Sequence, residues 1–133
     1  MNDTRPSTIL LVDNDDRLRS ILAARLTGHG YHCITACSGA QALSMFRSND
    51  VRMVVTDLNM PAGDGIALAT EIRRHSGVPI MFVTGFRDTF RRVMRAIPDV
   101  TILQKPFDPE TLLELIGSSL SRTRARDSLR EEV

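Results

Sequence analysis

The sequence predicts a single α/β domain of the doubly wound kind, in which a five-stranded parallel sheet is flanked by five helices. Three observations predict this fold. Five short apolar runs of strand length recur along the chain, helical patterns of apolar residues lie between them, and the connections are short. Because parallel strands must be joined by a crossover, this alternation predicts a parallel sheet with right-handed connections.

The predicted strands are apolar almost throughout, as expected for strands covered on both faces. They comprise residues 8–12, 31–36, 51–57, 79–83 and 100–104. Runs rich in β-branched residues and too short for an ordinary helix indicate strands. Pro79 is compatible with this assignment because it stands at the beginning of its strand.

The predicted helices have polar start signals and glycine-rich or proline-rich stops. Three side chains are predicted to cap the helices that follow them: Ser38, Asp64 and Asp108. The first helix should bury one face, made up of Leu18, Ile21, Leu22 and Leu26. The fourth helix, at about residues 88–96, carries several arginines, which we interpret as a solvated face.

Composition limits the classes of protein that this chain can be. It has 133 residues, 42% of them hydrophobic and 25% charged, which is typical of one globular domain. We expect a flexible N-terminus over residues 1–7, the domain over residues 8–121, and a polar tail or helix extension over residues 122–133, with no DNA-binding domain in this chain. The absence of a long apolar run or signal segment predicts a cytoplasmic protein with no membrane contact. The net charge of +1 gives no global reason to expect nucleic acid as a partner.

The two cysteines, Cys33 and Cys37, have no further cysteine or histidine at metal-site spacing. We therefore interpret them as reduced, buried thiols.

Polar residues stand at the end of four of the five predicted strands or directly after it. They are Asp13, Asn14, Asp57, Thr84 and Lys105. A single aspartate at a strand end is most simply a turn residue, but the carboxyl ends of parallel strands share one edge of the sheet. These side chains are therefore predicted to converge.

The chemistry of this set points to phosphoryl transfer. Neighbouring carboxylates repel unless a cation separates them, and hard oxygen ligands suit Mg²⁺. A lysine and a hydroxyl complete a cradle for a phosphoryl group, whose transfer depends mainly on positioning and charge neutralisation. The natural acceptor is Asp57, through an aspartyl-phosphate.

These residues resemble the receiver domain of two-component response regulators, chemotaxis-type receivers included, over about residues 8–120. The matching segments are Asp13-Asn14-Asp15, Asp57-Leu58-Asn59-Met60-Pro61, Asp64-Gly65, Thr84-Gly85 and Lys105-Pro106-Phe107. The resemblance implies a flavodoxin-like sheet of order 2-1-3-4-5. It also implies that a histidine kinase or phosphotransfer protein phosphorylates Asp57, with a protein target downstream and the domain a monomer or weak dimer.

The resemblance further implies roles for the neighbouring residues. Lys105 would pair with the phosphoryl group, and Thr84 would bond it once attached. Mg²⁺ would be held by Asp13, Asn14, Asp57 and Asn59, the last through its backbone carbonyl. The domain would catalyse only its own phosphorylation and dephosphorylation, and would not be an enzyme in the usual sense.

Two positions depart from the family pattern. Asn14 stands where a second carboxylate is usual, and its uncharged amide should bind Mg²⁺ more weakly. Ile102 occupies the switch position that often holds Tyr or Phe, so the signal would run through the Thr84 loop and the fourth helix, with Phe86 or Phe90 as a substitute.

Two other functions compete with a phosphorylated receiver. A pseudo-receiver would bind a partner without efficient phosphorylation, as Asn14 and Ile102 suggest. A phosphohydrolase of the haloacid-dehalogenase type would use Asp13-Asn14-Asp15 as its Asp-x-Asp motif, but the chain lacks a cap and the later acidic pair.

Overall fold

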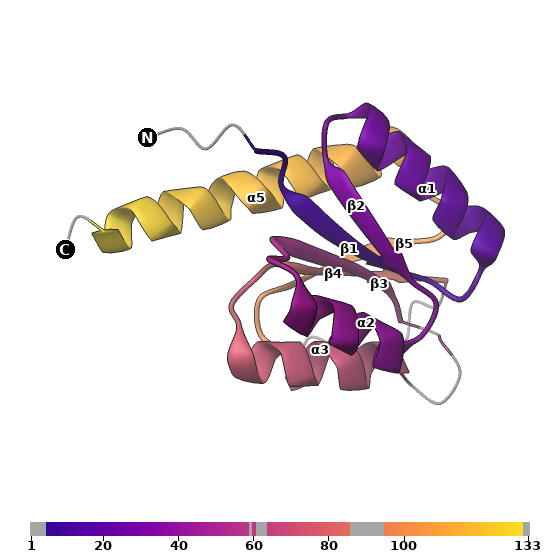
Figure 1. Cartoon of the computed structure of the whole chain (residues 1–133), viewed down its shortest axis with the longest axis horizontal. Helices are drawn as coiled ribbons and strands as arrows, with labels where there is room; N and C mark the ends of the chain where they lie inside the picture. The colour runs from indigo at the N-terminus through magenta and orange to yellow at the C-terminus, as the bar shows by residue number, and fades with distance from the viewer. Residues whose placement is uncertain (1–4, 59, 61–63, 86–94, 132–133) are drawn as a thin grey trace.

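A five-stranded parallel sheet forms the centre of the molecule (Figure 1). The computed structural model describes residues 5–58, 60, 64–85 and 95–131. The strands are β1 (Thr8–Val12), β2 (His32–Ala36), β3 (Met53–Asp57), β4 (Ile80–Thr84) and β5 (Val100–Gln104). They lie in the order β2-β1-β3-β4-β5, and every neighbouring pair is parallel. The predicted fold class and strand order are confirmed.

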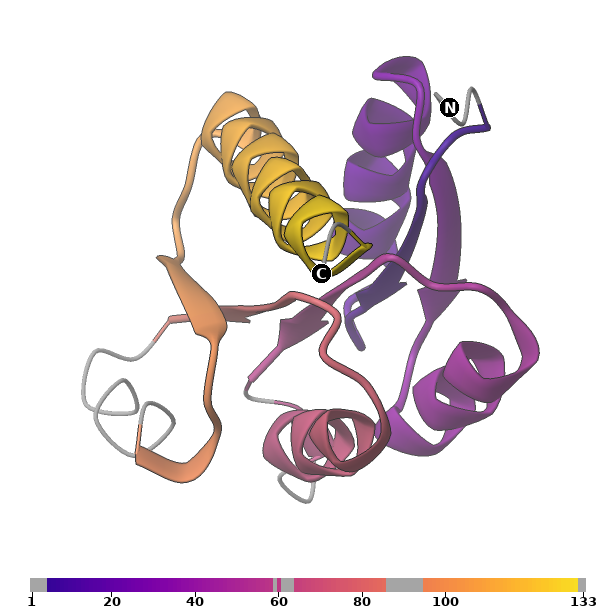
Figure 2. The same cartoon turned by 90° about the vertical axis from the view of Figure 1, so that its left-hand side faces the viewer.

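Helices cover both faces of the sheet, as Figure 2 shows. The described helices are α1 (Asp16–Gly28), α2 (Gly39–Ser48), α3 (Asp64–His75) and α5 (Pro109–Glu131). Helices α1 and α5 lie on one face, and α2 and α3 lie on the other. The helix predicted at about residues 88–96 lies outside the described residues, apart from its last two.

Two apolar layers hold the helices to the sheet, and alternate residues of each strand enter opposite layers. In β1, Ile9 and Leu11 pack toward α1 and α5, whereas Leu10 and Val12 pack toward α2 and α3. Phe82 of β4 is completely buried in the second layer. Each fully buried side chain of this kind contributes about 1.5–3 kcal/mol. The apolar strands thus fix the sheet between the two helix pairs.

Polar caps set where the helices begin. The Ser38 hydroxyl accepts a hydrogen bond from the backbone N–H of Gln41 at 3.2 Å, as predicted. Asp108 likewise accepts from the N–H of Glu110 at 3.0 Å, just before α5. Asp64 is the first residue of α3, and the residue before it lies outside the described residues.

Two predictions of burial are wrong. Ile21 is 48% exposed because α1 turns Leu22 and Leu26, spaced by four residues, toward the sheet. Cys37 is exposed because β2 ends at Ala36, the residue before it, so this thiol lies outside the covered strand. Cys33 is half-buried within β2, and both cysteines are free thiols.

The last helix is much longer than the sheet requires. Residues 122–131 continue α5 and carry it past the end of the sheet (Figure 1). The first four residues of the chain lie outside the described residues. In the described part of the chain, no helix combines the length and the apolar character needed to cross a membrane.

Candidate functional site

Four polar residues lie at the carboxyl edge of the sheet, on four adjacent strands. Asp13 follows β1 and Asp57 ends β3, while Thr84 ends β4 and Lys105 follows β5. The backbone N–H of Lys105 donates to the carbonyl of Thr84 at 2.8 Å, which ties the ends of β4 and β5 together. Residues from both ends of the sequence therefore meet because the strand order makes their strands neighbours.

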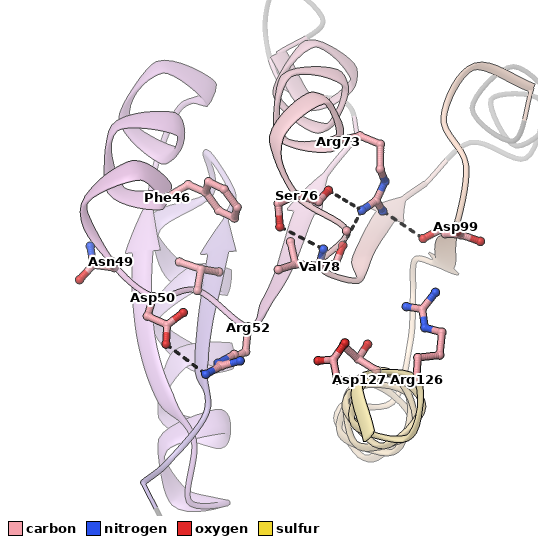
Figure 3. A pocket seen from close by; sticks show the side chains of 13 residues that line it. Phe46, Asn49, Asp50, Arg52, Arg73, Ser76, Val78, Asp99, Arg126 and Asp127 are labelled. Atoms are coloured by element: carbon pink, nitrogen blue, oxygen red, sulfur yellow. Dashed lines mark hydrogen bonds and ion pairs between the residues drawn. The ribbon is translucent and has the colours of Figure 1, made fainter. Parts of the chain in front are cut away.

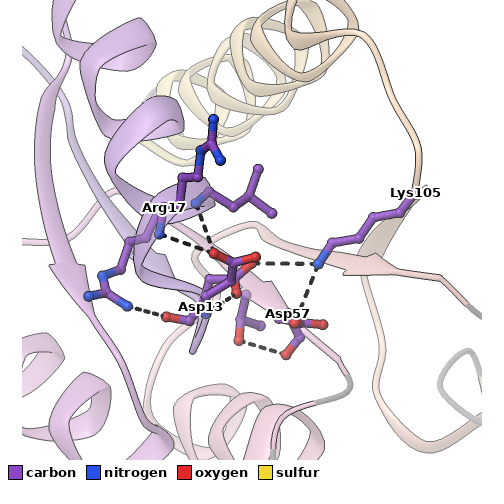
Figure 4. A network of polar contacts seen from close by, with 8 residues as sticks. Asp13, Arg17, Asp57 and Lys105 are labelled. Carbon is purple, nitrogen blue, oxygen red and sulfur yellow. Dashed lines mark hydrogen bonds and ion pairs between the residues drawn. The ribbon is translucent and has the colours of Figure 1, made fainter.

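Lys105 joins the two carboxylates at this edge (Figure 4). Its Nζ lies 3.5 Å from Oδ2 of Asp57 and 3.7 Å from Oδ2 of Asp13. Asp13 is only 3% exposed and Asp57 only 7% exposed. Buried carboxylates need a cationic partner because desolvation of an unpaired charge is costly. The lysine supplies that partner from the far end of the sheet.

The pKa of Asp13 is raised even though Lys105 lies beside this carboxylate. Burial raises the pKa of Asp13, and the carboxylates of Asp57 and Asp15 raise it further. A hydrogen bond from the backbone N–H of Asp15 to Asp13 Oδ1, 2.8 Å long, and the charge of Lys105 act in the opposite direction without cancelling the increase. The site therefore favours an additional positive charge.

The donor set at this edge fits a hard divalent cation. Asp13 and Asp57 offer carboxylate oxygens, the ligands that Mg²⁺ prefers, and Mg²⁺ usually keeps several waters beside one or two carboxylates. No three His, Cys, Asp or Glu side chains gather into a metal site among the residues that the structure describes. Asn14 is exposed in the loop beside Asp13, and Asn59 lies outside the described residues.

Thr84 and Ile102, the predicted switch residues, lie in different surroundings. Thr84 is completely buried at the end of β4. Ile102 stands opposite Phe82 in the sheet and is half-buried against the apolar layer of α2 and α3. Phe86 and Phe90, the suggested substitutes, lie outside the described residues.

Gly65 has a role that its motif alone did not reveal. A Cβ atom at this position would lie 2.4 Å from the backbone oxygen of Asp57 and 3.0 Å from Cα of Leu58. Only glycine therefore lets the first turn of α3 approach the end of β3 so closely. The Thr56 hydroxyl donates to the same Asp57 oxygen at 3.1 Å. The signal in the sequence was the Asp64-Gly65 pair that follows the strand.

Comparison with known proteins assigns this arrangement to a family. The family model for the response regulator receiver domain matches residues 9–117. The chain belongs to the response regulator receiver family. The fold that the resemblance implied and the membership itself are thereby confirmed.

Receiver relatives are found among curated proteins and among solved structures. A probable transcriptional regulator, ycf27 of Cyanidium caldarium, is 35% identical over 93% of this chain and 50% of its own length. The chain thus spans about half the length of this curated relative. The chemotaxis protein CheY4 of Vibrio cholerae is 27% identical, with a TM-score of 0.79 over 86% of this chain and 98% of its own. The response regulator TrrA of Thermotoga maritima, solved in complex with Mg²⁺ and BeF, is 28% identical, with a TM-score of 0.72 over 84% of this chain and 97% of its own.

Proposed function

We propose that this receiver domain accepts a phosphoryl group on Asp57 and that phosphorylation changes which protein it binds. The observation that carries the proposal is the position of the Lys105 ammonium, 3.5 Å from Asp57 and 3.7 Å from Asp13 at the carboxyl edge of the sheet. The donor would be a sensor histidine kinase or a histidine phosphotransfer protein, and a protein target would read the result. The domain acts in the cytoplasm as a monomer or weak dimer.

The transfer is a displacement at phosphorus. A carboxylate oxygen of Asp57 forms a bond to phosphorus while the bond to the donor nitrogen breaks, and the donor keeps the electron pair. Lys105 neutralises charge on the phosphoryl oxygens, and the rigid end of β3 holds the nucleophile in position. Mg²⁺, when held by Asp13, Asn14 and Asp57 with the backbone carbonyl of Asn59, supplies further charge neutralisation. The complex of TrrA with Mg²⁺ and BeF supports this assignment.

Thr84 and Lys105 carry the switch in this proposal. Both lie beside Asp57 at strand ends that are already tied by the bond between Lys105 N–H and Thr84 O. A phosphoryl group on Asp57 offers new acceptor oxygens to the lysine and the threonine hydroxyl, which shifts the population toward the arrangement that places them closest. Ile102 contributes by packing rather than by a hydrogen bond, because its side chain has no polar group.

The direct test is phosphorylation by a small-molecule donor. The protein is incubated with acetyl phosphate and Mg²⁺, and its intact mass is measured. We expect one added phosphoryl group on the natural chain, none on Asp57→Asn, and one on the control Asp50→Asn, whose side chain is exposed at the opposite edge of the sheet. A natural chain that stays unmodified at saturating donor would contradict the proposal.

A second candidate function is that of a pseudo-receiver, which binds its partner without efficient phosphorylation. The observation that favours it is Asn14, an uncharged amide in place of a second carboxylate. The Asn14→Asp variant restores a carboxylate at this exposed loop position and should tighten Mg²⁺ binding by about tenfold. Millimolar Mg²⁺ that binds Asn14→Asp but not the natural chain would support the pseudo-receiver. Comparable binding by both would remove its support. The family match does not favour a phosphohydrolase.

A further inference from the structure

A cavity lies at the amino edge of the sheet, opposite the edge that carries Asp57. It has a volume of about 470 Å³, within the range of small-molecule sites. Its walls come from the segments just before β3, β4 and β5 and from the extended end of α5 (Figure 3). The residues from α5 are Thr123, Arg126 and Asp127. All three lie beyond residue 117, where the family match ends.

One wall of the cavity is apolar and another carries guanidinium groups. Phe46, Val51 and Val78 line the apolar part. Arg73 and Arg126 both line this part of the cavity, and in Figure 3 the side chain of Arg126 rises from α5 below Arg73, beside Asp99. An apolar wall with a few convergent polar groups is the usual composition of a small-molecule site.

Arg73 is held rigidly and still has one N–H to offer. Its guanidinium donates to four backbone carbonyls, at 2.7 to 3.2 Å: those of Ser76, Val78, Pro98 and Asp99. A guanidinium has five N–H donors, so one has no acceptor among the residues that the structure describes. A donor fixed in this way loses little entropy when it binds a ligand.

Arg126 is the uncommitted cation of the cavity. No ion pair or hydrogen bond engages its side chain within the part of the chain that the structure describes. Burial lowers the pKa of Arg73, the charge of Arg126 lowers it further, and Asp99 opposes both. Two guanidinium groups that line one wall of a cavity repel each other, and an anion bound between them offsets that repulsion.

We propose that this cavity binds a small organic anion, a molecule with a carboxylate or phosphate headgroup on an apolar body. The headgroup lies between Arg126 and the remaining N–H of Arg73, and the body packs against Phe46, Val51 and Val78. Arg52 is already paired with Asp50 at 3.2 Å and does not take part. Asp99 and Asp127 are exposed and oppose an anion, so we expect dissociation constants of about 0.1 to 1 mM.

The test uses three probes that each carry one phenyl ring and differ in their polar group. 3-Phenylpropionate carries a carboxylate, phenyl phosphate carries a phosphate, and 3-phenylpropanol is neutral. Binding is followed by NMR shifts of the backbone amides of Gly77, Val78 and Asp127, which line the cavity. Saturable shifts with at least one anion, and none with the alcohol, are expected, and the anion that binds identifies the headgroup. Equal binding of the alcohol, or no saturable shift with either anion at 10 mM (about ten times the upper expected constant), would overturn the proposal.

Two variants on α5 test the site, and a third on the same exposed stretch of the helix serves as a control. Arg126→Gln should weaken anion binding by about tenfold, whereas Arg124→Gln, two residues away and outside the cavity, should leave it unchanged. Asp127→Asn should tighten it, because an opposing charge is removed. Glutamine has nearly the helix propensity of arginine, so the helix itself is preserved. Equal losses in Arg126→Gln and Arg124→Gln, or weaker binding in Asp127→Asn, would count against the site.

Discussion

Asp13 is a nearly buried carboxylate beside a second one, and the arrangement costs folding free energy. Its pKa in the folded protein is raised by burial and by the charges of Asp57 and Asp15. A raised folded-state pKa means that this group favours folding fully only below its unfolded-state pKa, and that the contribution is lost as pH rises through the folded-state value. The ionised carboxylate therefore works against the folded state at any pH above the folded-state pKa.

We expect Asp13→Asn to increase the free energy of unfolding at pH 7 by about 1 kcal/mol in metal-free protein. The amide oxygen can still accept the hydrogen bond from the N–H of Asp15. Urea unfolding with EDTA measures the difference, which should shrink as the pH is lowered toward 4. Asp50→Asn, on the surface, should change stability by less than about 0.5 kcal/mol. A less stable Asp13→Asn at pH 7 would show that charge repulsion is not the dominant effect.

The two thiols should differ sharply in reactivity. Burial raises the pKa of Cys33 to about 11, so only about one molecule in a thousand carries its thiolate at pH 8. Cys37 is exposed just beyond β2. Iodoacetamide at pH 8 should therefore alkylate one thiol per folded chain rapidly, and peptide mapping should locate it at Cys37. Guanidinium chloride should expose both thiols, and equal rates in the folded chain would contradict this expectation.

At the scale of elements, the contact between α3 and the end of β3 depends on the absence of a side chain at Gly65. Gly65→Ala places a Cβ atom against the backbone oxygen of Asp57, so α3 must move away from the end of β3. We expect a loss of about 1–3 kcal/mol in the free energy of unfolding, together with slower phosphorylation of Asp57. Gly77→Ala is the matched control, because no atom lies within 4 Å of the position that its Cβ would take. Equal stability of the two variants would disprove the close approach.

Arg73, on α3, binds the segments that lead into β4 and β5 by hydrogen bonds to their backbone carbonyls. It leaves the end of α3 and holds both the turn before β4 and the turn before β5, where Asp99 has a positive φ of 55°. Arg73→Met should lower the free energy of unfolding by about 2 to 4 kcal/mol, because four carbonyls lose a charged donor. Arg74→Met removes only an exposed ion pair with Glu71 and should cost less than about 1 kcal/mol. Chemical denaturation compares the two, and similar losses would refute the role of Arg73.

At the scale of the whole molecule, protection should decrease from the centre of the sheet to its edges. Every residue of β3 and β4 is buried, whereas the edge strand β2 has one buried residue of five, and so does the other edge strand, β5. In hydrogen exchange, amides of β3 should open only with global unfolding, and those of β2 should exchange through smaller openings. NMR-detected exchange measures both rates. Faster exchange in β3 than in β2 would contradict the layered core.

Much of the fold was predictable because local patterns and the global fold agree. The strand positions and the Ser38 and Asp108 caps follow from short-range rules of burial and hydrogen bonding. The exposure of Ile21 and Cys37 was not predictable in the same way. The exposure of Ile21 depends on which face of α1 meets the sheet, and that of Cys37 depends on where β2 ends. Packing against other elements sets both features.

The sequence by itself determined the alternation of strands and helices, the family resemblance, and the placing of Asp57 and Lys105 after strands, because these are properties of short segments. Tertiary structure alone decided how near those residues lie, in which direction the pKa of Asp13 is shifted, why Gly65 must be glycine, and that α5 lines a cavity together with Arg73. Distances between segments far apart in the chain arise from strand order and packing, which no local pattern specifies.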